Sequence, residues 1–544
     1  MSVNDAYKKW LADFGDDPHI GAELRAIGGD SEAVEDRFYR DLAFGTAGMR
    51  GVLGAGPNRM NAYVVRRATK ALADYILQTP GGAQRGVASA DDARKYSDFF
   101  AMQAALTLCE SGVKAYLFDS LRPVPVLSFT VRHLRCIAGI VITASHNPPE
   151  YNGYKVYWED GGQMPPEQAG EVQKRIDKLD FVSAKPMDRD KALAKGLLTM
   201  IPPEVDDAYV AAVKKLCVNP ELAREMGDKL KIVYTPLHGS GNVPVRRVLR
   251  ELGFTNVFVV PEQEKPDPAF PTVKLPNPED PAAFTLALKL QAELGADAVF
   301  GTDPDCDRVG VAVKDAKGEA RILTGNQIGC LLLHYILSQM HHRHELPENG
   351  AVVKSIVTTE MARAICKDFG VALFDVLTGF KFIAEEIQKF EEKGDYRFLF
   401  GFEESFGYLS GTDVRDKDGV NACMLIAEAA AWYKSRGMTL YDALSALMAR
   451  YGHYGEKVAS FTLTGEEGLR EMGRIMAHMR KNPPAEFGGV PVLAVRDYKT
   501  GTRIVEGKTE KLTLPESDVL YYELRDKAWV CVRPSGTEPK IKLY

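Results

Sequence analysis

Three aspartates lie within five residues of one another in the segment GTDPDCDR at 301–308. Two carboxylates about 4 Å apart repel each other by about 4 kcal/mol at an effective dielectric near 20, so a cation is expected between them. Mg²⁺ prefers oxygen ligands and suits a short acidic loop of this kind. A calcium-binding EF-hand is excluded because Arg308 and Lys314 stand where that motif needs Gly and Glu. A solvated acidic turn, or a phosphatase with an aspartate nucleophile, is the alternative.

A serine with a neighbouring histidine forms a second reactive pattern, in the segment TASHNP at 143–148. Serine is a weak nucleophile unless it is activated, and the Gly-x-Ser-x-Gly elbow of hydrolases is absent. The Ser145–His146 pair alone is weak support for catalysis, because adjacent side chains seldom reach each other. Downstream, NGYKVY at 152–157 contains Lys155, although its Asn-Gly pair would also fit a hairpin turn.

Two further loops carry groups that could hold a phosphosugar. RPSGTEPK at 533–540 combines a guanidinium, two hydroxyls and a glycine, which suits a phosphate cradle. GFEES at 401–405 offers a hydrogen-bond acceptor and a hydroxyl, which suit sugar hydroxyl groups. Either loop would also pass as an ordinary surface turn, so neither is decisive alone.

Two other patterns are set aside. LHGSGNVP at 237–244 begins like a dinucleotide-binding loop but has Pro244 where the third glycine belongs. HHRH at 341–344 follows a helix-like segment and contains a cation, so a solvated helix end is favoured over a metal site.

The elements that must position these loops alternate between strands and helices. Short apolar runs at 137–142, 231–234, 296–300 and 396–400 each end at a polar, glycine-containing loop. Helix-like stretches at 281–294, 327–340 and 421–436 lie between or after them. This pattern predicts an α/β fold, in which ligands bind beyond the carboxyl ends of the strands.

The chain has 544 residues, which at about 150 residues per domain predicts three or four domains. Polar or proline-rich segments favour four, at 1–200, 201–325, 326–455 and 456–544. The first three share the α/β pattern, and the smaller last one is typical of α+β. A hydrophobic fraction of 45% with 26% charged residues excludes a disordered chain.

The net charge of −6 gives no basic field for nucleic acid or anionic lipid, so any anionic substrate must be met by local cations. We find neither a signal peptide nor a segment apolar enough to span a membrane. The eight cysteines form no C-x-x-C pair, which predicts reduced, packed thiols. A cytoplasmic location is therefore expected.

Taken together and in this order, TASHNP, GTDPDCDR, GFEES and RPSGTEP resemble the α-D-phosphohexomutase superfamily. GTAGMRG at 45–51 and the long N-terminal lead-in look most like its branch of phosphoglucomutases and phosphopentomutases. The match covers about residues 41–544. Two features depart from the family pattern. The sequence ends at Tyr544, soon after the last loop, where the family's fourth domain usually continues, and the family's loop near 92–94 is only loosely matched.

The resemblance implies four domains around a central cleft, three of them similar and with mixed sheets. Ser145 would be a phosphoserine whose phosphoryl group coordinates Mg²⁺ together with Asp303, Asp305 and Asp307. Arg308 would contact the same phosphoryl group, and Arg50, His146 and Lys155 would surround it, with His146 and Lys155 as candidates for proton handling. The residues implied to contact the substrate are Thr378, Gly379, Glu403, Ser405, Lys417, Arg533, Ser535, Gly536 and Thr537.

We therefore expect a Mg²⁺-dependent mutase that interconverts glucose 1-phosphate and glucose 6-phosphate through glucose 1,6-bisphosphate. Mannose and pentose phosphates remain alternative substrates of the same superfamily. A metal-dependent sugar phosphatase and a catalytically silent sugar-phosphate binding protein are the other classes. The expected partner is a small phosphosugar, with no nucleic acid or membrane, and the sequence leaves a monomer and a homodimer both open.

Overall fold

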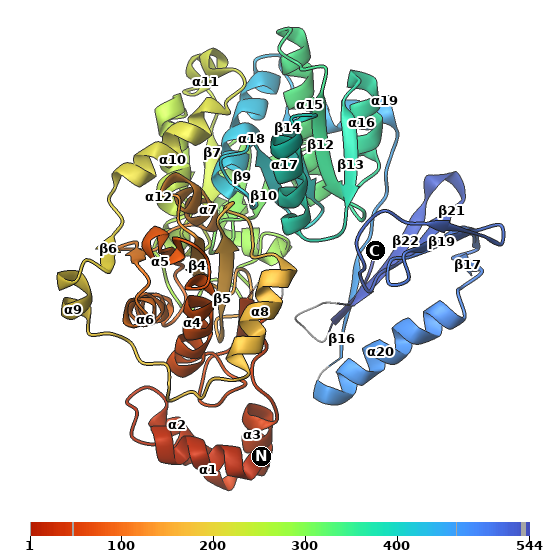
Figure 1. Ribbon diagram of the computed structural model, residues 1–544. Coiled ribbons are helices and arrows are strands. Elements are labelled where there is room, and N and C mark those ends of the chain that lie inside the picture. The colour runs from red at the N-terminus through yellow and green to blue at the C-terminus, as the bar shows by residue number, and fades with distance from the viewer. Residues whose placement is uncertain (1, 46–47, 464, 535–539) are drawn as a thin grey trace.

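The computed structural model of the protein describes residues 2–45, 48–463, 465–534 and 540–544 (Figure 1). Three mixed sheets with flanking helices follow one another along the chain, and an antiparallel sheet comes last. A helical N-terminal segment precedes them, with α1 (Val3–Phe14), α2 (Gly21–Ala26), η1 (Ile27–Gly29) and α3 (Ser31–Phe38). Its aromatic side chains form its core, since Trp10 packs edge-on against Phe14 and Phe38.

The first sheet has six strands in the order β1-β5-β4-β2-β3-β6. Strands β2, β3, β4 and β6 are parallel, whereas β5 runs antiparallel to β4, and β1 antiparallel to β5. On β2, Val87 faces one core and Ala88 the other, so both faces of the sheet are covered. The strands are β1 (Gly48–Val52), β2 (Val87–Asp91), β3 (Ala115–Leu117), β4 (Ala138–Ile142), β5 (Tyr151–Trp158) and β6 (Leu198–Met200); the helices are α4 (Ala62–Ile76), α5 (Gly82–Arg85), α6 (Ser97–Glu110), α7 (Val124–His133), α8 (Pro166–Ile176) and α9 (Arg189–Ala194).

The second sheet has the order β11-β10-β9-β7-β8, in which β8, β7 and β9 are parallel and β10 and β11 are antiparallel. Its strands are β7 (Ile232–Thr235), β8 (Val257–Val259), β9 (Ala298–Thr302), β10 (Val309–Lys314) and β11 (Ala320–Ile322). The helices of this region are α10 (Glu204–Lys215), α11 (Pro220–Met226), α12 (Asn242–Leu252), α13 (Pro261–Glu264), η2 (Pro281–Phe284) and α14 (Thr285–Leu294).

The third sheet has the order β13-β12-β14-β15, in which only β15 is antiparallel to its neighbour. Its strands are β12 (Gly350–Ser355), β13 (Ala372–Val376), β14 (Arg397–Glu403) and β15 (Gly407–Ser410). The helices are α15 (Gly325–His342), α16 (Met361–Phe369), α17 (Phe380–Lys393), α18 (Gly419–Lys434) and α19 (Leu440–Tyr451). Thr324 begins α15 with a capping box, which satisfies the first backbone donors of that buried helix.

One arrangement recurs in all three mixed sheets. A parallel strand ends at a polar loop, and the next strand returns antiparallel beside it: β4 to β5, β9 to β10, and β14 to β15. Two of these loops carry Ser145 and the three aspartates, and Glu403 is the last residue of β14, where the third loop begins. The predicted α/β class with mixed sheets is confirmed, and the loops lie at the carboxyl ends of parallel strands, where such folds bind ligands.

The C-terminal sheet is antiparallel in the order β16-β23-β22-β21-β18-β19-β20, with β17 paired to β18. Its elements are β16 (Ala459–Thr462), α20 (Gly465–Lys481), β17 (Glu486–Phe487), β18 (Val490–Asp497), β19 (Thr502–Val505), β20 (Lys508–Lys511), β21 (Leu520–Leu524), η3 (Arg525–Lys527), β22 (Trp529–Pro534) and β23 (Lys540–Leu543). This domain lies beside the third sheet (Figure 1), and a small apolar cluster containing Ile356, Leu377, Tyr498 and Tyr521 joins the two.

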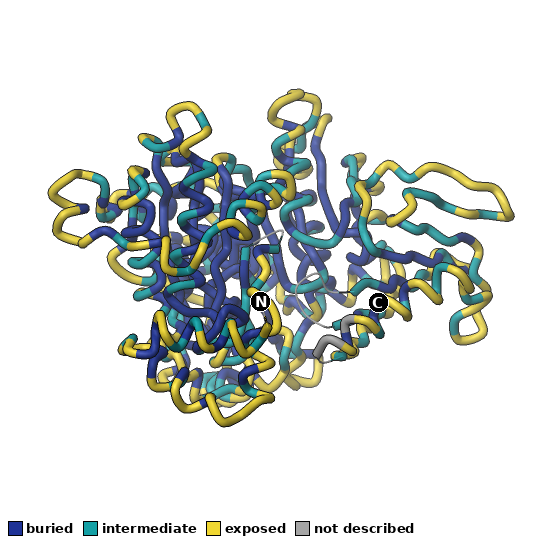
Figure 2. The backbone as a smooth tube through the Cα atoms, turned by 60° about the horizontal axis from the view of Figure 1, so that its bottom comes forward, coloured by how far each residue is buried: buried dark blue, intermediate teal, exposed yellow. Residues whose placement is uncertain are grey.

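Buried residues are concentrated in the α/β part of the molecule, as Figure 2 shows. The predicted boundaries near 200, 325 and 455 fall after β6, after β11 and after α19. All eight cysteines are free thiols, and all except Cys217 are buried. Among the described residues, no helix is long and apolar enough to cross a membrane.

Candidate active site

The serine loop leaves β4 through a strained turn. Ser145 has a φ of 51°, a left-handed backbone conformation that is uncommon for a residue with a side chain. Thr143 supports the turn, because its Oγ1 accepts a hydrogen bond from the Ser145 amide at 2.8 Å and donates one to Asp92 Oδ2 at 2.6 Å. The side chain of Ser145 is thereby held in a buried position.

Arg94, in the segment that follows the neighbouring strand β2, holds the same loop in place. Its guanidinium is fully buried and donates hydrogen bonds to the carbonyl oxygens of Pro148 at 2.8 Å and Tyr151 at 3.1 Å, and also to those of Ser145 and Asn147. Sequence analysis assigned no role to Asp92 or Arg94. The available signal was a pair of opposite charges directly after a buried strand.

The three aspartates converge on one point between β9 and β10. One carboxylate oxygen from each of Asp303, Asp305 and Asp307 lies within 4.8 Å of the other two, and all three residues are buried. Asp305 Oδ1 and Asp307 Oδ1 have no hydrogen-bond partner among the residues that the structure describes. Three buried carboxylates, two of which have an oxygen without a partner among the described residues, fit a divalent cation that prefers oxygen ligands.

The charges inside this cluster are unequal. Burial, together with the Asp305 and Asp307 carboxylates, raises the pKa of Asp303 well above its usual range. Burial also opposes ionisation of Asp305, but the Lys155 ammonium overrides it and holds the pKa of Asp305 below its usual range. Lys155 Nζ lies 2.8 Å from Asp305 Oδ2 and 4.0 Å from Asp307 Oδ2. A cation next to these buried carboxylates therefore favours their ionised forms.

The serine loop and the aspartate loop meet across two sheets. Ser145 Oγ donates a hydrogen bond to Asp303 Oδ2 at 2.8 Å. Lys155 reaches the same cluster from β5. The alternative of a hairpin turn at NGYKVY is wrong, because the whole segment belongs to this strand. Asn152 and Gly153 lie inside β5, where a Cβ on Gly153 would stand 2.5 Å from the Thr143 carbonyl oxygen. The glycine there allows close approach of β5 to the serine loop.

His146 lies closer to Ser145 than expected for adjacent residues. Its Nδ1 is 3.2 Å from Ser145 Oγ. The expectation that the two side chains would not meet is wrong, because the left-handed backbone of Ser145 turns them toward each other. Burial and the charges of Arg308 and Arg50 hold the pKa of His146 well below its usual range.

Two arginines flank this cluster. Arg50, on β1, donates a hydrogen bond to Asn147 Oδ1 at 2.8 Å. Arg308 forms an ion pair with Glu279, and its Nε lies 3.8 Å from Asp307 Oδ1. The Arg308 Nε is buried and has no hydrogen-bond partner among the described residues. Both guanidiniums thus lie next to the serine and aspartate loops.

The third sheet contributes a carboxylate and an ammonium. Glu403, at the end of β14, accepts a hydrogen bond from the Gly379 amide at 2.7 Å. Burial and the neighbouring Glu404 carboxylate raise the pKa of Glu403 to about 7. Lys417 Nζ lies 2.9 Å from Asp307 Oδ2, so Lys417 contacts the aspartate cluster directly. Ser405 is half-buried on the loop that follows β14.

Two of the remaining predicted contacts, Thr378 and Arg533, belong to the described residues. The Thr378 Oγ1 is buried and has no hydrogen-bond partner among the described residues. Arg533, at the end of β22, is close enough to Glu403 for its charge to oppose the rise in the pKa of that carboxyl. Ser535, Gly536 and Thr537, the rest of the predicted phosphate cradle, lie outside the described residues.

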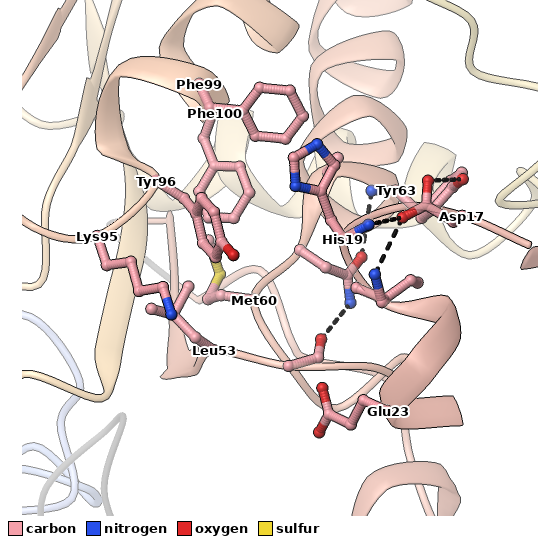
Figure 3. Close-up of a pocket in the computed structure, with 14 residues that line it drawn as sticks. Asp17, His19, Glu23, Leu53, Met60, Tyr63, Lys95, Tyr96, Phe99 and Phe100 are labelled. Atoms are coloured by element: carbon pink, nitrogen blue, oxygen red, sulfur yellow. Dashed lines mark hydrogen bonds between the residues drawn. The ribbon is translucent and has the colours of Figure 1, made fainter. Parts of the chain in front are cut away.

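A separate cavity of about 200 Å³ lies between the N-terminal helices and the first sheet (Figure 3). Its carboxylates already have partners in the chain. Asp17 accepts hydrogen bonds from the Tyr63 hydroxyl and from the backbone of His19, and Glu23 accepts one from the Ala55 amide. We assign this cavity no part in the chemistry.

Comparisons with known proteins agree with this geometry. Family models for the phosphoglucomutase/phosphomannomutase α/β/α domains I, II and III match residues 41–183, 207–318 and 324–451. A phosphoglucomutase of Staphylococcus haemolyticus is 37% identical over 516 residues, which are 94% of this chain and 91% of that protein. A phosphoglucomutase of Staphylococcus aureus (strain MRSA252) is 37% identical over 519 residues, with 94% and 91% covered.

Among solved structures, parafusin, a phosphoglucomutase from Paramecium, shares the fold in its open form. Its TM-score is 0.67 at 17% sequence identity, and the match covers 93% of this chain and 90% of that chain. The three successive family models and the relatives at 37% identity identify the chain. It belongs to the phosphoglucomutase/phosphomannomutase family of phosphosugar mutases, within the α-D-phosphohexomutase superfamily.

Proposed function

We propose that the protein interconverts glucose 1-phosphate and glucose 6-phosphate, with Ser145 as the residue that carries the phosphoryl group. The observation that supports this most directly is the 2.8 Å contact between Ser145 Oγ and Asp303 Oδ2, which joins a serine on the first sheet to an acidic cluster on the second. The staphylococcal relatives at 37% identity carry the name phosphoglucomutase, which favours glucose as the sugar.

The acidic cluster is proposed to hold Mg²⁺ through Asp303, Asp305 and Asp307, together with a phosphoryl oxygen on Ser145. The buried, unpartnered oxygens of Asp305 and Asp307 support an oxygen-preferring divalent ion. When bound, such an ion supplies positive charge that stabilises the transferring phosphoryl group. This assignment rests on the donor set of the chain itself.

In the proposed reaction, the phosphoryl group leaves Ser145 Oγ and bonds to the free hydroxyl oxygen of the bound sugar phosphate. The proton of that hydroxyl passes to a nearby base, for which the neutral imidazole of His146 is the candidate because its Nδ1 lies 3.2 Å from Ser145 Oγ. Ser145 Oγ takes up a proton as the phosphoryl group leaves, and the Lys155 ammonium at the same cluster is the candidate donor. The product of this half-reaction is glucose 1,6-bisphosphate. It turns over in the site and returns its other phosphoryl group to Ser145 Oγ, which regenerates the starting enzyme.

Binding would be divided between the remaining residues. Arg50 and Arg308 neutralise charge on the transferring group, which is the main requirement of phosphoryl transfer. Glu403 and Ser405, with Thr378, Gly379 and Lys417, would contact the sugar. Arg533 would pair with the phosphate that does not react, in a cradle that includes Ser535, Gly536 and Thr537.

Coupled assays with glucose, mannose and ribose 1-phosphates test the substrate. We expect turnover to be highest with glucose 1-phosphate and to require both Mg²⁺ and a trace of glucose 1,6-bisphosphate. Mannose 1-phosphate is the second candidate, because the matched family includes phosphomannomutases and Glu403 and Ser405 would contact hydroxyls common to both sugars. Release of inorganic phosphate without isomerisation would contradict the mutase proposal and favour a phosphatase.

A further inference from the structure

A strap of four consecutive charged residues, 415–418, connects β15 to α18. Arg415, Asp416, Lys417 and Asp418 are 0%, 1%, 8% and 2% exposed. Buried charges are costly unless each is paired, so a run of four needs specific partners. The strap finds these partners in three different parts of the molecule.

The two ends of the strap have contacts that lie outside the candidate active site. The Arg415 amide donates a hydrogen bond to Ser128 Oγ on α7 at 2.9 Å, and its guanidinium pairs with Glu391 on α17. Asp418 accepts a hydrogen bond from the Tyr209 hydroxyl on α10 at 2.9 Å and caps the start of α18. These two residues fix the strap between helices.

The middle of the strap leads from the first sheet to the acidic cluster. Asp416 Oδ2 accepts hydrogen bonds from the Tyr157 hydroxyl at 2.8 Å and from Gln163 Nε2 at 3.1 Å. Its other oxygen, Oδ1, accepts from the Lys417 amide at 2.8 Å and from Lys417 Nζ at 3.0 Å. Asp416 therefore holds Lys417 with one oxygen and the first sheet with the other.

Tyr157 and Lys155 stand two positions apart on β5, so their side chains project from the same face of that strand. Lys155 Nζ meets Asp305 and Lys417 Nζ meets Asp307. Asp416 thus links the strand that carries one ammonium to the side chain that carries the other. Its position determines how the two ammonium groups are spaced along the acidic cluster.

The path of the Lys417 side chain is also restricted from the opposite side. A Cβ on Gly407 would lie 2.2 Å from Lys417 Cδ, so the aliphatic stem passes directly over that glycine. The Nζ atom lies 5.6 Å from the centroid of the Phe380 ring, at the start of α17. Lys417 is therefore confined by packing along its length, and Asp416 and Asp307 determine the direction of its ammonium group.

We infer that Asp416 is a positioning residue for phosphoryl transfer, which acts by directing the Lys417 ammonium onto Asp307 and toward the phosphoryl group on Ser145. This inference rests on the proposed function. Asp416 itself contacts neither Ser145 nor the carboxylates of the acidic cluster in any hydrogen bond or ion pair recorded among the described residues. Burial raises the pKa of Asp307 and the Asp416 charge adds to this rise, so the part of the Asp416 effect that passes through Lys417 is the part that a double-mutant cycle isolates.

A double-mutant cycle tests this inference. Asp416→Asn keeps the size of the side chain and an acceptor for Tyr157 but removes the charge that holds Lys417. We expect kcat for glucose 1-phosphate to fall about 10- to 100-fold, the range for misplacing a group that acts on the substrate, while KM changes less than about threefold. When Asp416→Asn is combined with Lys417→Met, kcat should fall no further than in Lys417→Met alone. Both substitutions remove the same contribution, that of the correctly positioned Lys417 ammonium group.

Asp418→Asn is the matched control, since Asp418 belongs to the same buried strap but contacts Tyr209 and α18. The loss of kcat that Asp418→Asn causes should add to the loss that Lys417→Met causes, because a general loss of packing does not depend on Lys417. Thermal unfolding with and without Mg²⁺ gives a readout independent of turnover, and the Mg²⁺-induced stabilisation should persist in Asp416→Asn. Should that variant not fold, Tyr157→Phe removes one partner of Asp416 and should show the same non-additivity with a smaller loss.

An unchanged kcat in Asp416→Asn, a loss that adds to that of Lys417→Met, or a lost Mg²⁺ response would overturn the positioning role. A wild-type protein without mutase turnover would instead contradict the proposed function. The two failures are therefore distinguishable in the same set of assays.

Discussion

Ser145 Oγ and Asp303 Oδ2 lie 2.8 Å apart, although the two residues are separated by 158 positions in the chain and stand on different sheets. This contact exists because each residue follows a parallel strand whose partner returns antiparallel. The same construction on three sheets brings a serine, an acidic cluster and a carboxylate into one region. The proposed chemistry depends on this convergence.

Asp305→Asn should remove the response of the protein to Mg²⁺. A ligand that binds only the folded protein stabilises it by about 2.7 kcal/mol at 100 times its dissociation constant. We expect Mg²⁺ to raise the melting temperature of the wild type and of Asp413→Asn, which changes an exposed carboxylate outside the cluster. Asp305→Asn should show no such rise. Equal Mg²⁺ responses in all three proteins would contradict a metal site at the aspartates.

Glu403→Gln should stabilise the protein at high pH. The pKa of Glu403 is about 7 in the folded protein, above its value of 4.5 when unperturbed. The stability that the protonated carboxyl contributes is therefore present below pH 4.5 and is lost as the pH rises through 7. Glutamine stays neutral, so the variant should match the wild type near pH 4.5 and exceed it by up to about 3 kcal/mol at pH 8.

Thermal unfolding of the two proteins at a series of pH values measures this difference. The curves of melting temperature against pH should separate between pH 5 and pH 8, with the variant above the wild type. Parallel curves would contradict the raised pKa of Glu403. Because Glu403 is also proposed to contact the sugar, the stabilised variant should have a higher KM.

Arg94→Lys should loosen the serine loop. A lysine cannot reproduce the planar guanidinium that donates to four carbonyl oxygens, and unsatisfied buried groups cost about 1–3 kcal/mol each. We expect faster amide hydrogen exchange in residues 143–151 and a fall in kcat. Arg85→Lys, which changes an arginine in a part-exposed ion pair with Glu159, is the control. Exchange rates that are identical in both variants would argue against this role of Arg94.

Arg533→Ala should weaken substrate binding more than the chemistry at Ser145. Hydrogen bonds to charged groups contribute about 1.5–3 kcal/mol, which corresponds to roughly a 10- to 100-fold rise in KM. Arg525→Ala, an exposed arginine in the same domain, should leave KM unchanged. Steady-state kinetics with glucose 1-phosphate measure KM and kcat for both variants. An unaltered KM in Arg533→Ala would count against the phosphate cradle.

Much of the site could be predicted because its loops follow apolar strands. The runs at 137–142, 296–300 and 396–400 correspond to β4, β9 and β14, and their polar loops carry the residues expected from sequence. Ordered motifs identified the family, which no single loop could do. The α/β class followed from the alternation of strands and helices.

Contacts that depend on backbone conformation were not predictable. The proximity of Ser145 and His146 requires the positive φ of Ser145, which has no signature in residue type. Gly153 lies within β5 where a Cβ would stand 2.5 Å from the Thr143 carbonyl oxygen, a contact that exists only once β5 has folded back beside the serine loop. Arg94 donates to carbonyl oxygens more than 50 residues away, and Asp416 accepts a hydrogen bond from Tyr157 on the first sheet, so these contacts appear only after folding.

The central claim is that Ser145 carries the phosphoryl group, and mass spectrometry of the intact protein tests it directly. After incubation with glucose 1,6-bisphosphate and Mg²⁺, the wild type should contain a species heavier by about 80 Da, the mass of one phosphoryl group. Peptide mapping should place it on Ser145. Ser145→Ala should keep its fold, lack this species and lose isomerisation. A phosphoryl group on another residue, or undiminished turnover in Ser145→Ala, would contradict the account.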